Sequence, residues 1–205
     1  GLTRGVERGV LKLILTRGDG GRGYRAPAPA RPRRILMLTP WPDHPESWRS
    51  TGVRARYCRT RLGHQPLLAG LKHLNRLEQV LARSEWDDPK VGEGLMLDLD
   101  GRVVEGTQTN LFALVEGRLL TPRLDRCGVA GVVRGLVLDE AARLGLAAVE
   151  TDVEPQHLAD AQALFLTSSL AGIWPVSELD GRAFDPARVP AELHAAVLAA
   201  AFRPW

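Results

Sequence analysis

Two predicted β-hairpins constrain the fold of this 205-residue chain more than any other feature of its sequence. They occupy residues 94–105 and 110–121, and in each an acidic residue followed by glycine stands between two apolar runs. Such a pair is typical of the tight turn that joins two antiparallel strands. We therefore expect a hairpin-rich β region in the middle of the chain, with the short polar segment 105–110 crossing from one hairpin to the next.

Strand and helix signals alternate along the rest of the chain. Strand-length apolar or alternating runs lie at residues 10–15, 34–39, 52–60, 163–169 and 173–179. We expect the first of these to be buried, with Lys12 facing outward. Helices are predicted from the glycine-led segment after Gly128 to about Leu144, with Gly145 as the C-cap, and from residue 191 to 202.

Three prolines between residues 40 and 45 interrupt the chain after its second strand. Proline lacks a backbone donor and fixes φ, so we place a domain boundary there. The sequence thus predicts an α/β (α+β) protein in two parts, residues 1–41 and residues 42–205.

The loop after the first strand, residues 18–24, formally matches the GxGxxG pattern of dinucleotide-binding sites. That pattern binds a pyrophosphate only when a helix follows and supplies its N-terminal amides. Here a proline-rich segment follows, so we reject the dinucleotide interpretation. A mobile loop that presents Arg22 and Tyr24 to an anionic ligand and a plain connecting loop both stay open.

Lysine is rare in this chain, since only Lys12, Lys72 and Lys90 are lysines among 27 basic residues. Around Lys72 the leucines recur at helical spacing, which predicts a helix over residues 71–83 with Lys72 at its entry and one apolar face buried. The residues of that face are Leu71, Leu74, Leu77, Val80 and Leu81. Lys72 is either a solvated helix lysine or a primary amine kept for chemistry, because arginine cannot form a Schiff base.

Three further features could belong to the same site. Glu105 closes a strand, Gly131 leads into a helix whose first amides are exposed, and a strand ends in the hydroxyl residues 167–169. Each is weak evidence alone, because most glycine-led helices bind no phosphate. Together with Lys72 they suit a phosphate-bearing aldehyde cofactor, which needs an amine, a carboxylate for a ring nitrogen, and amides and hydroxyls for the phosphate.

Composition narrows the function classes. The net charge of +3 is small and the arginines are scattered, so we expect no nucleic-acid partner. Cys58 and Cys127 lie far apart without histidines at metal-ligand spacing, so we expect no metal site and a reduced, cytoplasmic location. No apolar run approaches a membrane span, and we expect no membrane partner.

Residues 69–81, Ala-Gly-Leu-Lys-His-Leu-Asn-Arg-Leu-Glu-Gln-Val-Leu, closely resemble the signature of aminodeoxychorismate lyases, which are fold-type IV pyridoxal-phosphate enzymes. Residues 105–112 look like the Glu-Gly-x-x-x-Asn-Leu-Phe segment of that class. Segments 120–122, 131–134 and 166–176 follow in the order and approximate spacing of the class. The resemblance extends over nearly the whole chain from about residue 10.

The resemblance implies a fold and an assembly. Residues 1–41 would be the C-terminal part of a small α+β domain, and residues 42–205 a larger pseudo-barrel domain with flanking helices. The cofactor, pyridoxal 5'-phosphate, would lie in the cleft between them, in what is usually a homodimer. Members of the family carry a further N-terminal portion before the position of Gly1, including an arginine for the cofactor phosphate, so we expect the gene product to be longer than this sequence.

The resemblance also implies residue roles. Lys72 would form the Schiff base with the cofactor and then act as general base, and Glu105 would pair with the pyridine nitrogen. The phosphate would lie on the backbone amides of Val132 and Val133, helped by the Ser169 hydroxyl. Arg22 and Tyr24 are the candidates for a substrate carboxylate. Asn110 either forms a hydrogen bond within the site or turns the chain, and the structural role is the favoured one. Arg134 would stabilise the local loop.

The implied reaction is the conversion of 4-amino-4-deoxychorismate to 4-aminobenzoate and pyruvate, a step of folate biosynthesis. A branched-chain or D-amino-acid aminotransferase would share the lysine, the glutamate and the phosphate site. The residues that flank Lys72 favour the lyase. A truncated cofactor-binding protein without turnover is a third interpretation.

Overall fold

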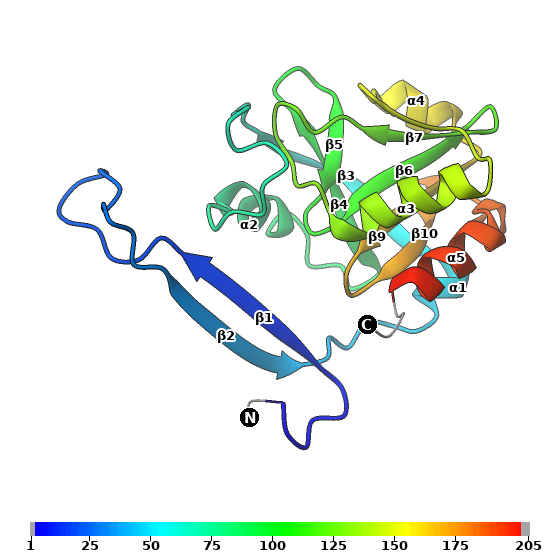
Figure 1. The fold of residues 1–205 in the computed structure, drawn as a ribbon. Helices are drawn as coiled ribbons and strands as arrows, with labels where there is room; N and C mark the ends of the chain where they lie inside the picture. Colours follow the sequence, from blue (N-terminus) through cyan, green and yellow to red (C-terminus); the bar gives the residue numbers. More distant parts are fainter. Residues whose placement is uncertain (1–2, 202–205) are drawn as a thin grey trace. The chain divides into compact units, whose positions relative to one another are not determined.

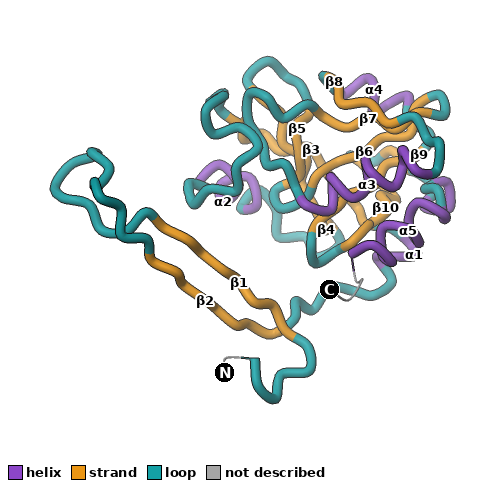
Figure 2. The backbone as a smooth tube through the Cα atoms, viewed as in Figure 1, coloured by secondary structure: helices purple, strands orange, loops and turns teal. Residues whose placement is uncertain are grey.

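The structure, a computed structural model, describes residues 3–201 and comprises two compact units, one up to Pro45 and one from Glu46 (Figures 1 and 2). None of the described helices is both long and apolar enough to cross a membrane.

The first unit is built on a two-stranded antiparallel ribbon. Strand β1 (Gly9–Thr16) pairs with β2 (Arg33–Pro40) over its full length. Both strands were predicted, but the expected burial of the first is wrong, because Leu13 and Leu15 are 65% and 67% exposed. A ribbon of two strands has little surface with which to cover its own side chains.

The second unit contains the other described elements. Its helices are α1 (Trp48–Thr51), α2 (Leu77–Arg83), α3 (Val132–Arg143), α4 (Pro155–Asp160), α5 (Ala191–Ala201) and the 3₁₀ turn η1 (Pro186–Arg188). Its strands are β3 (Val53–Leu62), β4 (Val91–Asp98), β5 (Val103–Gly106), β6 (Asn110–Val115), β7 (Arg118–Pro122), β8 (Ala148–Thr151), β9 (Ala163–Ser168), β10 (Gly172–Leu179) and β11 (Arg182–Ala183). Both predicted hairpins, β4–β5 and β6–β7, are present.

These strands form one nine-stranded mixed sheet within the described part of the chain (Figure 1). Its order is β5-β4-β3-β10-β9-β6-β7-β8, and β11 pairs with β10. Strand β3 runs parallel to β4 and β10, and β7 runs parallel to β8, whereas the other pairs are antiparallel. Because β9 lies beside β6, Thr167 near its end comes opposite Asn110 at the start of β6.

Alternate residues along the strands enter two different cores, as the two-residue period of a strand requires. In β6, Leu111 faces one core and Phe112 the other, where Phe112 stacks on Phe165 with ring centroids 5.0 Å apart. Helices α3 and α5 cover this second core through Val137 and Leu193, both fully buried. The sheet thereby fixes the N-terminal end of α3.

The segment around Lys72 corrects one prediction. The helix begins at Leu77 rather than near residue 71, and the leucines expected to be buried are 55–70% exposed. The buried residue of α2 is Ala82, which packs with Trp86 and Cys58. Lys72 therefore lies in an extended loop before the helix.

Side-chain bonds explain why the helix starts late. The guanidinium of Arg76 donates to the carbonyl oxygens of Leu71 and His73, at 2.7 and 3.0 Å. Those carbonyls would accept backbone N–H groups if the helix began earlier. The local bonds stabilise the loop that carries Lys72.

Candidate functional site

One pocket of ≈ 210 Å³ in the second unit gathers four chain segments. Its lining comprises Gly70, Lys72, Arg76, Gln79, Glu105, Gly106, Thr107, Gln108, Thr109, Asn110, Val129, Ala130, Gly131, Val132, Val133, Arg134, Thr167, Ser168 and Ser169. The five residues proposed from sequence for the cofactor, namely Lys72, Glu105, Val132, Val133 and Ser169, are all among them. Arg22 and Tyr24 are not, since they lie in the β1–β2 loop of the first unit, where Tyr24 is fully exposed.

Backbone pairing brings the Lys72 loop to the start of α3. The N–H of Gly70 donates to the Gly128 carbonyl at 2.9 Å, and the N–H of Ala130 donates to the Gly70 carbonyl at 3.0 Å. Gly70 adopts φ = +79°, a conformation that favours glycine. This short parallel bridge places the lysine, two residues later, at the pocket.

Glu105 is the buried acid of the pocket, with 4% of its surface exposed. Burial raises its pKa to about 7, although a hydrogen bond from the Val129 N–H, 2.8 Å from Oε2, the charges of Arg76 and Lys72 and a bond from Gln79 all oppose the rise. The carboxyl group can therefore change its charge near neutral pH when a cation approaches it.

The N-terminus of α3 faces the pocket without a side-chain cap. Its N-cap residue is Gly131, and no side chain accepts a hydrogen bond there. The first amides of a helix have no partner within it, so those of Val132 and Val133 are available to an anion. Asn110 holds the preceding turn, because its Nδ2 donates to the Val129 carbonyl at 2.8 Å. Because Asn110 and Val129 both line the pocket, this bond fits either of the two roles considered for Asn110.

Thr167 belongs to the hydroxyl-rich strand end that the sequence indicated, where only Ser169 was assigned a role. The side chain of Thr167 is 1% exposed, its hydroxyl has no hydrogen-bond partner, and it lines the pocket at the end of β9. Burial of an unpartnered hydroxyl is unfavourable unless a ligand supplies the bond. Ser169, which was proposed from sequence, lines the same pocket but is exposed.

Arg134 contributes to the fold around the pocket, as expected. Its guanidinium is buried and donates from Nη2 to the Pro122 carbonyl at 3.0 Å and to Glu150 Oε2 at 2.6 Å. Both bonds tie the first turn of α3 to the end of β7 and to β8. These bonds anchor the helix start, while the buried Nε of Arg134, which also lines the pocket, has no hydrogen-bond partner.

The residues present fit a phosphate-bearing aldehyde. The pocket offers a primary amine at Lys72, a buried carboxylate at Glu105, uncapped helix amides and the unpartnered Thr167 hydroxyl. An uncapped helix start and a buried hydroxyl without a partner both suit an anion.

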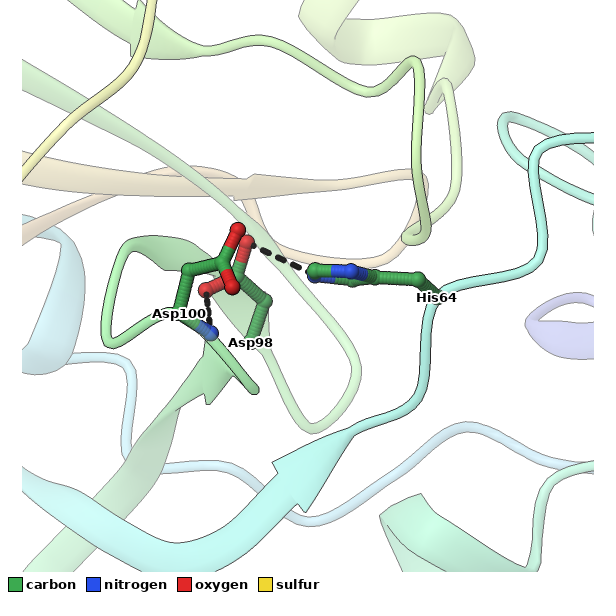
Figure 3. A group of neighbouring side chains, drawn as sticks. All are labelled: His64, Asp98 and Asp100. Atoms are coloured by element: carbon green, nitrogen blue, oxygen red, sulfur yellow. Dashed lines mark hydrogen bonds and ion pairs between the residues drawn. The ribbon is translucent and has the colours of Figure 1, made fainter.

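A second polar cluster lies away from the pocket, where His64, Asp98 and Asp100 come together (Figure 3). Asp98 Oδ2 lies 3.1 Å from His64 Nε2, and Asp98 Oδ1 accepts the N–H groups of Asp100 and Arg102. Burial raises the pKa of Asp98, but these hydrogen bonds outweigh it and lower the pKa overall. Arg102 Nη1 also lies 2.6 Å from Asp100 Oδ2. The acids are thus already paired, and we assign the cluster to the stability of the β4–β5 turn.

Comparison with known proteins gives consistent matches. The sequence profile described as "Amino-transferase class IV" matches residues 2–179. An aminodeoxychorismate lyase of Vibrio harveyi is 39% identical over 83% of this chain and 63% of its own length. A D-alanine aminotransferase of Bacillus licheniformis is 28% identical over 85% of this chain and 60% of its own length. The chain therefore spans somewhat less than two thirds of these relatives.

Among solved structures, the 4-amino-4-deoxychorismate lyase of Pseudomonas aeruginosa is similar to this chain with a TM-score of 0.88 and 52% sequence identity. The match covers 91% of this chain and 69% of that one.

Proposed function

We propose, from the premise that the chain belongs to the class IV aminotransferase family, that it acts as an aminodeoxychorismate lyase. Its fold is the fold-type IV α/β fold with a curled mixed sheet, as predicted. The family is dependent on pyridoxal phosphate. The proposed reaction converts 4-amino-4-deoxychorismate to 4-aminobenzoate and pyruvate.

The observation that carries the proposal is the degree of likeness to lyases. The chain is 52% and 39% identical to two proteins described as such lyases, 33% identical to a protein described as "Putative branched-chain-amino-acid aminotransferase" and 28% identical to the D-alanine aminotransferase. The pocket itself is compatible with either activity, because both need the same amine, carboxylate and anion site.

Four groups of the pocket would hold the cofactor. Lys72 Nζ would bind the aldehyde covalently, and Glu105 would face the ring nitrogen. A cationic ring nitrogen beside Glu105 favours the ionised carboxylate. The pKa of Glu105, which is raised in the cofactor-free protein, would therefore fall when the cofactor binds. The α3 amides of Val132 and Val133, with the Thr167 and Ser169 hydroxyls, would receive the phosphate.

The cofactor supplies an electron-withdrawing ring that stabilises negative charge on the adjacent substrate carbon. This chain supplies the proton transfer. Lys72 is the candidate base for the proton on the substrate carbon that bears the amino nitrogen, because it is the lysine of the pocket. Loss of that proton and departure of the neighbouring enolpyruvyl ether oxygen leave an aromatic ring, which favours the forward direction. The departing enolpyruvate takes up one proton at its methylene carbon, which replaces the proton that Lys72 removed, and becomes pyruvate.

The test supplies pyridoxal phosphate and aminodeoxychorismate and follows 4-aminobenzoate. We expect the wild type to form 4-aminobenzoate and Lys72→Ala to form none. Lys72→Ala should also lack the absorbance band of the cofactor bonded to the lysine amine. Lys90→Ala is the matched control, because Lys90 lies outside the pocket. Transamination between an amino acid and a 2-oxo acid without any 4-aminobenzoate would refute the lyase, and a band that survives Lys72→Ala would refute the role of that residue.

An aminotransferase is the alternative function, favoured by the similarity to D-alanine aminotransferase. The same assay separates the two. The substrate-carboxylate roles of Arg22 and Tyr24 stay predictions, as does the homodimer.

A further inference from the structure

Glu93 has a fully buried carboxylate that lies outside the pocket lining. Its Oε1 accepts the N–H of Gly94 at 2.9 Å, the N–H of Thr107 at 3.0 Å and the Thr107 hydroxyl at 2.6 Å. Its Oε2 accepts the N–H of Gln108 at 3.3 Å and the Thr109 hydroxyl at 2.9 Å. Four of these five bonds come from one segment, residues 107–109.

Hydrogen bonds alone compensate the burial of this carboxylate. Among residues 3–201, no lysine, arginine or histidine forms an ion pair with Glu93. Burial raises its pKa, and the bonds from Thr107, Gly94, Thr109 and Gln108 act in the opposite direction. A buried carboxylate without hydrogen bonds would destabilise the folded state. The bonds from residues 107–109 therefore hold that segment in place.

The backbone of the segment packs directly on the carboxylate. A Cβ atom at Gly106 would lie 2.2 Å from Thr109 Oγ1 and 2.8 Å from Glu93 Cδ, so only glycine fits there. The N–H of Gly106 donates to the Thr109 carbonyl at 2.7 Å and closes the turn. The turn is therefore held by the carboxylate beneath it, by its own backbone bond and by the Thr107 N–H, which also donates to the Gly94 carbonyl at 3.0 Å.

This turn forms one wall of the pocket. Thr107, Gln108 and Thr109 line it, between Glu105 on one side and Asn110 on the other. The two threonine hydroxyls are directed to Glu93, whereas the Gln108 side chain is exposed. Of the three side chains, that of Gln108 is the polar group left for a ligand.

We propose that Glu93 is a positioning residue of the site, which through the turn 106–109 fixes one wall of the pocket and presents Gln108 to the bound ligand. The inference rests on the proposed function, because pyridoxal phosphate, the cofactor proposed above, is the ligand used to test it. Glu93 touches neither the ligand nor the reacting atoms, and it acts through Thr107, Gln108 and Thr109.

The test is the substitution Glu93→Gln, which keeps the volume but replaces one acceptor oxygen by a donor. Glu85→Gln is the matched control, because the Glu85 side chain is 7% exposed and accepts the N–H groups of Arg59 and Thr60, both at 2.8 Å, and the Thr60 hydroxyl at 2.7 Å. Glu85 lies outside the pocket lining. Both variants alter a carboxylate that accepts backbone and threonine hydrogen bonds, but only Glu93 contacts the turn at the pocket. Glu85 also lies 4.0 Å from Arg56 and 3.9 Å from Arg59, so its substitution is at least as disruptive to local charge.

Two measurements are made on each purified variant, the Kd for pyridoxal phosphate from the absorbance of the bound cofactor and hydrogen exchange of the 106–109 amides. We expect Glu93→Gln to raise Kd by about tenfold or more and to speed exchange at residue 108, and Glu85→Gln to leave both within about twofold. The Thr107 N–H also donates to the Gly94 carbonyl at 3.0 Å, so exchange at residue 107 should change less. An equal Kd in wild type and Glu93→Gln, or an equal increase in both variants, would overturn the proposal.

A second variant keeps the proposal testable if Glu93→Gln does not fold. Thr107→Val with Thr109→Val removes two hydroxyl bonds to the carboxylate and leaves the backbone bonds, so a smaller increase in Kd is expected, and an unchanged Kd would count against the proposal. Neither measurement requires turnover. A wild type that binds the cofactor but forms no 4-aminobenzoate would therefore refute the lyase and leave the role of Glu93 to be decided by the same Kd comparison.

Discussion

Glu93 and Glu105 are both buried carboxylates of the second unit, and their partners assign them different tasks. Glu93 accepts five hydrogen bonds from the protein. Glu105 accepts one backbone N–H, and its ionised form is otherwise favoured by Gln79 and by the charges of Arg76 and Lys72. The protein thus saturates the first carboxylate, and leaves the second able to respond to a ligand.

The charge of Glu105 predicts how the stability of the cofactor-free protein depends on pH. Its pKa is about 7 in the folded state against an ordinary value of 4.5, so the folded state holds the proton more tightly than the unfolded state. The resulting stabilisation is fully present below pH 4.5 and is lost as pH rises through 7, an effect of about 3 kcal/mol. Glu105→Gln removes it.

Urea unfolding of wild type and Glu105→Gln at several pH values between about 5 and 8 measures this effect. We expect the free energy of unfolding of the wild type to fall relative to the variant as pH rises across this range. Parallel pH profiles for the two proteins would show that Glu105 does not titrate there.

Single residues of the site differ in how visible they are in the sequence. Lys72 stands out because lysine is rare in this chain, and both Lys72 and Glu105 lie in family motifs; the structure places both at one pocket. Glu93 could not be identified and Thr167 could not be singled out from residues 167–169, because their importance comes from burial, and a strand pattern does not reveal which hydroxyl or carboxylate loses contact with water. The hydroxyl residues at the end of this strand indicated the correct segment, but only Ser169 was proposed as a phosphate ligand.

At the scale of elements, the loop that carries Lys72 shows where periodicity misleads. The leucines from residue 71 to 81 have helical spacing, yet those of the loop and of α2 are mostly exposed, and helix begins only at Leu77. Spacing predicts an apolar face and does not say that a surface exists to cover it. Nor does it reveal that Arg76 holds the loop carbonyls, since its position in the pattern is that of a solvated helix residue.

The start of α3 offers a matched pair of glycine substitutions. A Cβ at Gly131 would lie 2.1 Å from Asn110 Oδ1, so Gly131→Ala must displace the side chain that holds Val129. We expect a loss of about 1–3 kcal/mol in unfolding free energy and weaker binding of pyridoxal phosphate. Denaturant unfolding and cofactor titration measure the two effects.

Gly135, one turn later in the same helix, is the control. A Cβ added there would meet no heavy atom within 4 Å, so Gly135→Ala should stabilise the protein by about 0.5–1 kcal/mol through helix propensity and leave cofactor binding unchanged. Equal effects of the two substitutions would show that the α3 start is not sterically constrained by Asn110.

For the whole molecule, the sequence predicted the local units better than their arrangement. The hairpins, the strands at residues 52–60 and 163–169 and the helix ending before Gly145 are confirmed, because turn residues and apolar periodicity act over short distances. The insertion of β9 between β10 and β6, which brings Thr167 opposite Asn110, depends on pairing between distant segments. Strand β8 and helix α4 were missed because both are short, at four and six residues.

The two units should also differ in stability. In β1 and β2, the ribbon exposes Leu11, Leu13 and Leu36 by 48–65%, and the residues of the hydrophobic cores all come from Val53 onward. A two-stranded ribbon held mainly by its own ladder is marginal in water, whereas Phe165 in β9 is fully buried.

Native-state hydrogen exchange of the full chain tests this difference. The amides of β1 that pair with β2 should exchange at least about a hundredfold faster than those of β9, because they open locally rather than by global unfolding. Leu13→Thr should leave the unfolding of the second unit within about 0.5 kcal/mol of wild type, and Leu164→Ala should cost about 2–5 kcal/mol, since Leu164 is fully buried in the core. Protection of β1 equal to that of β9 would mean that the exposed leucines of the ribbon are covered in solution, and the ribbon would then belong to the same cooperative unit as the sheet.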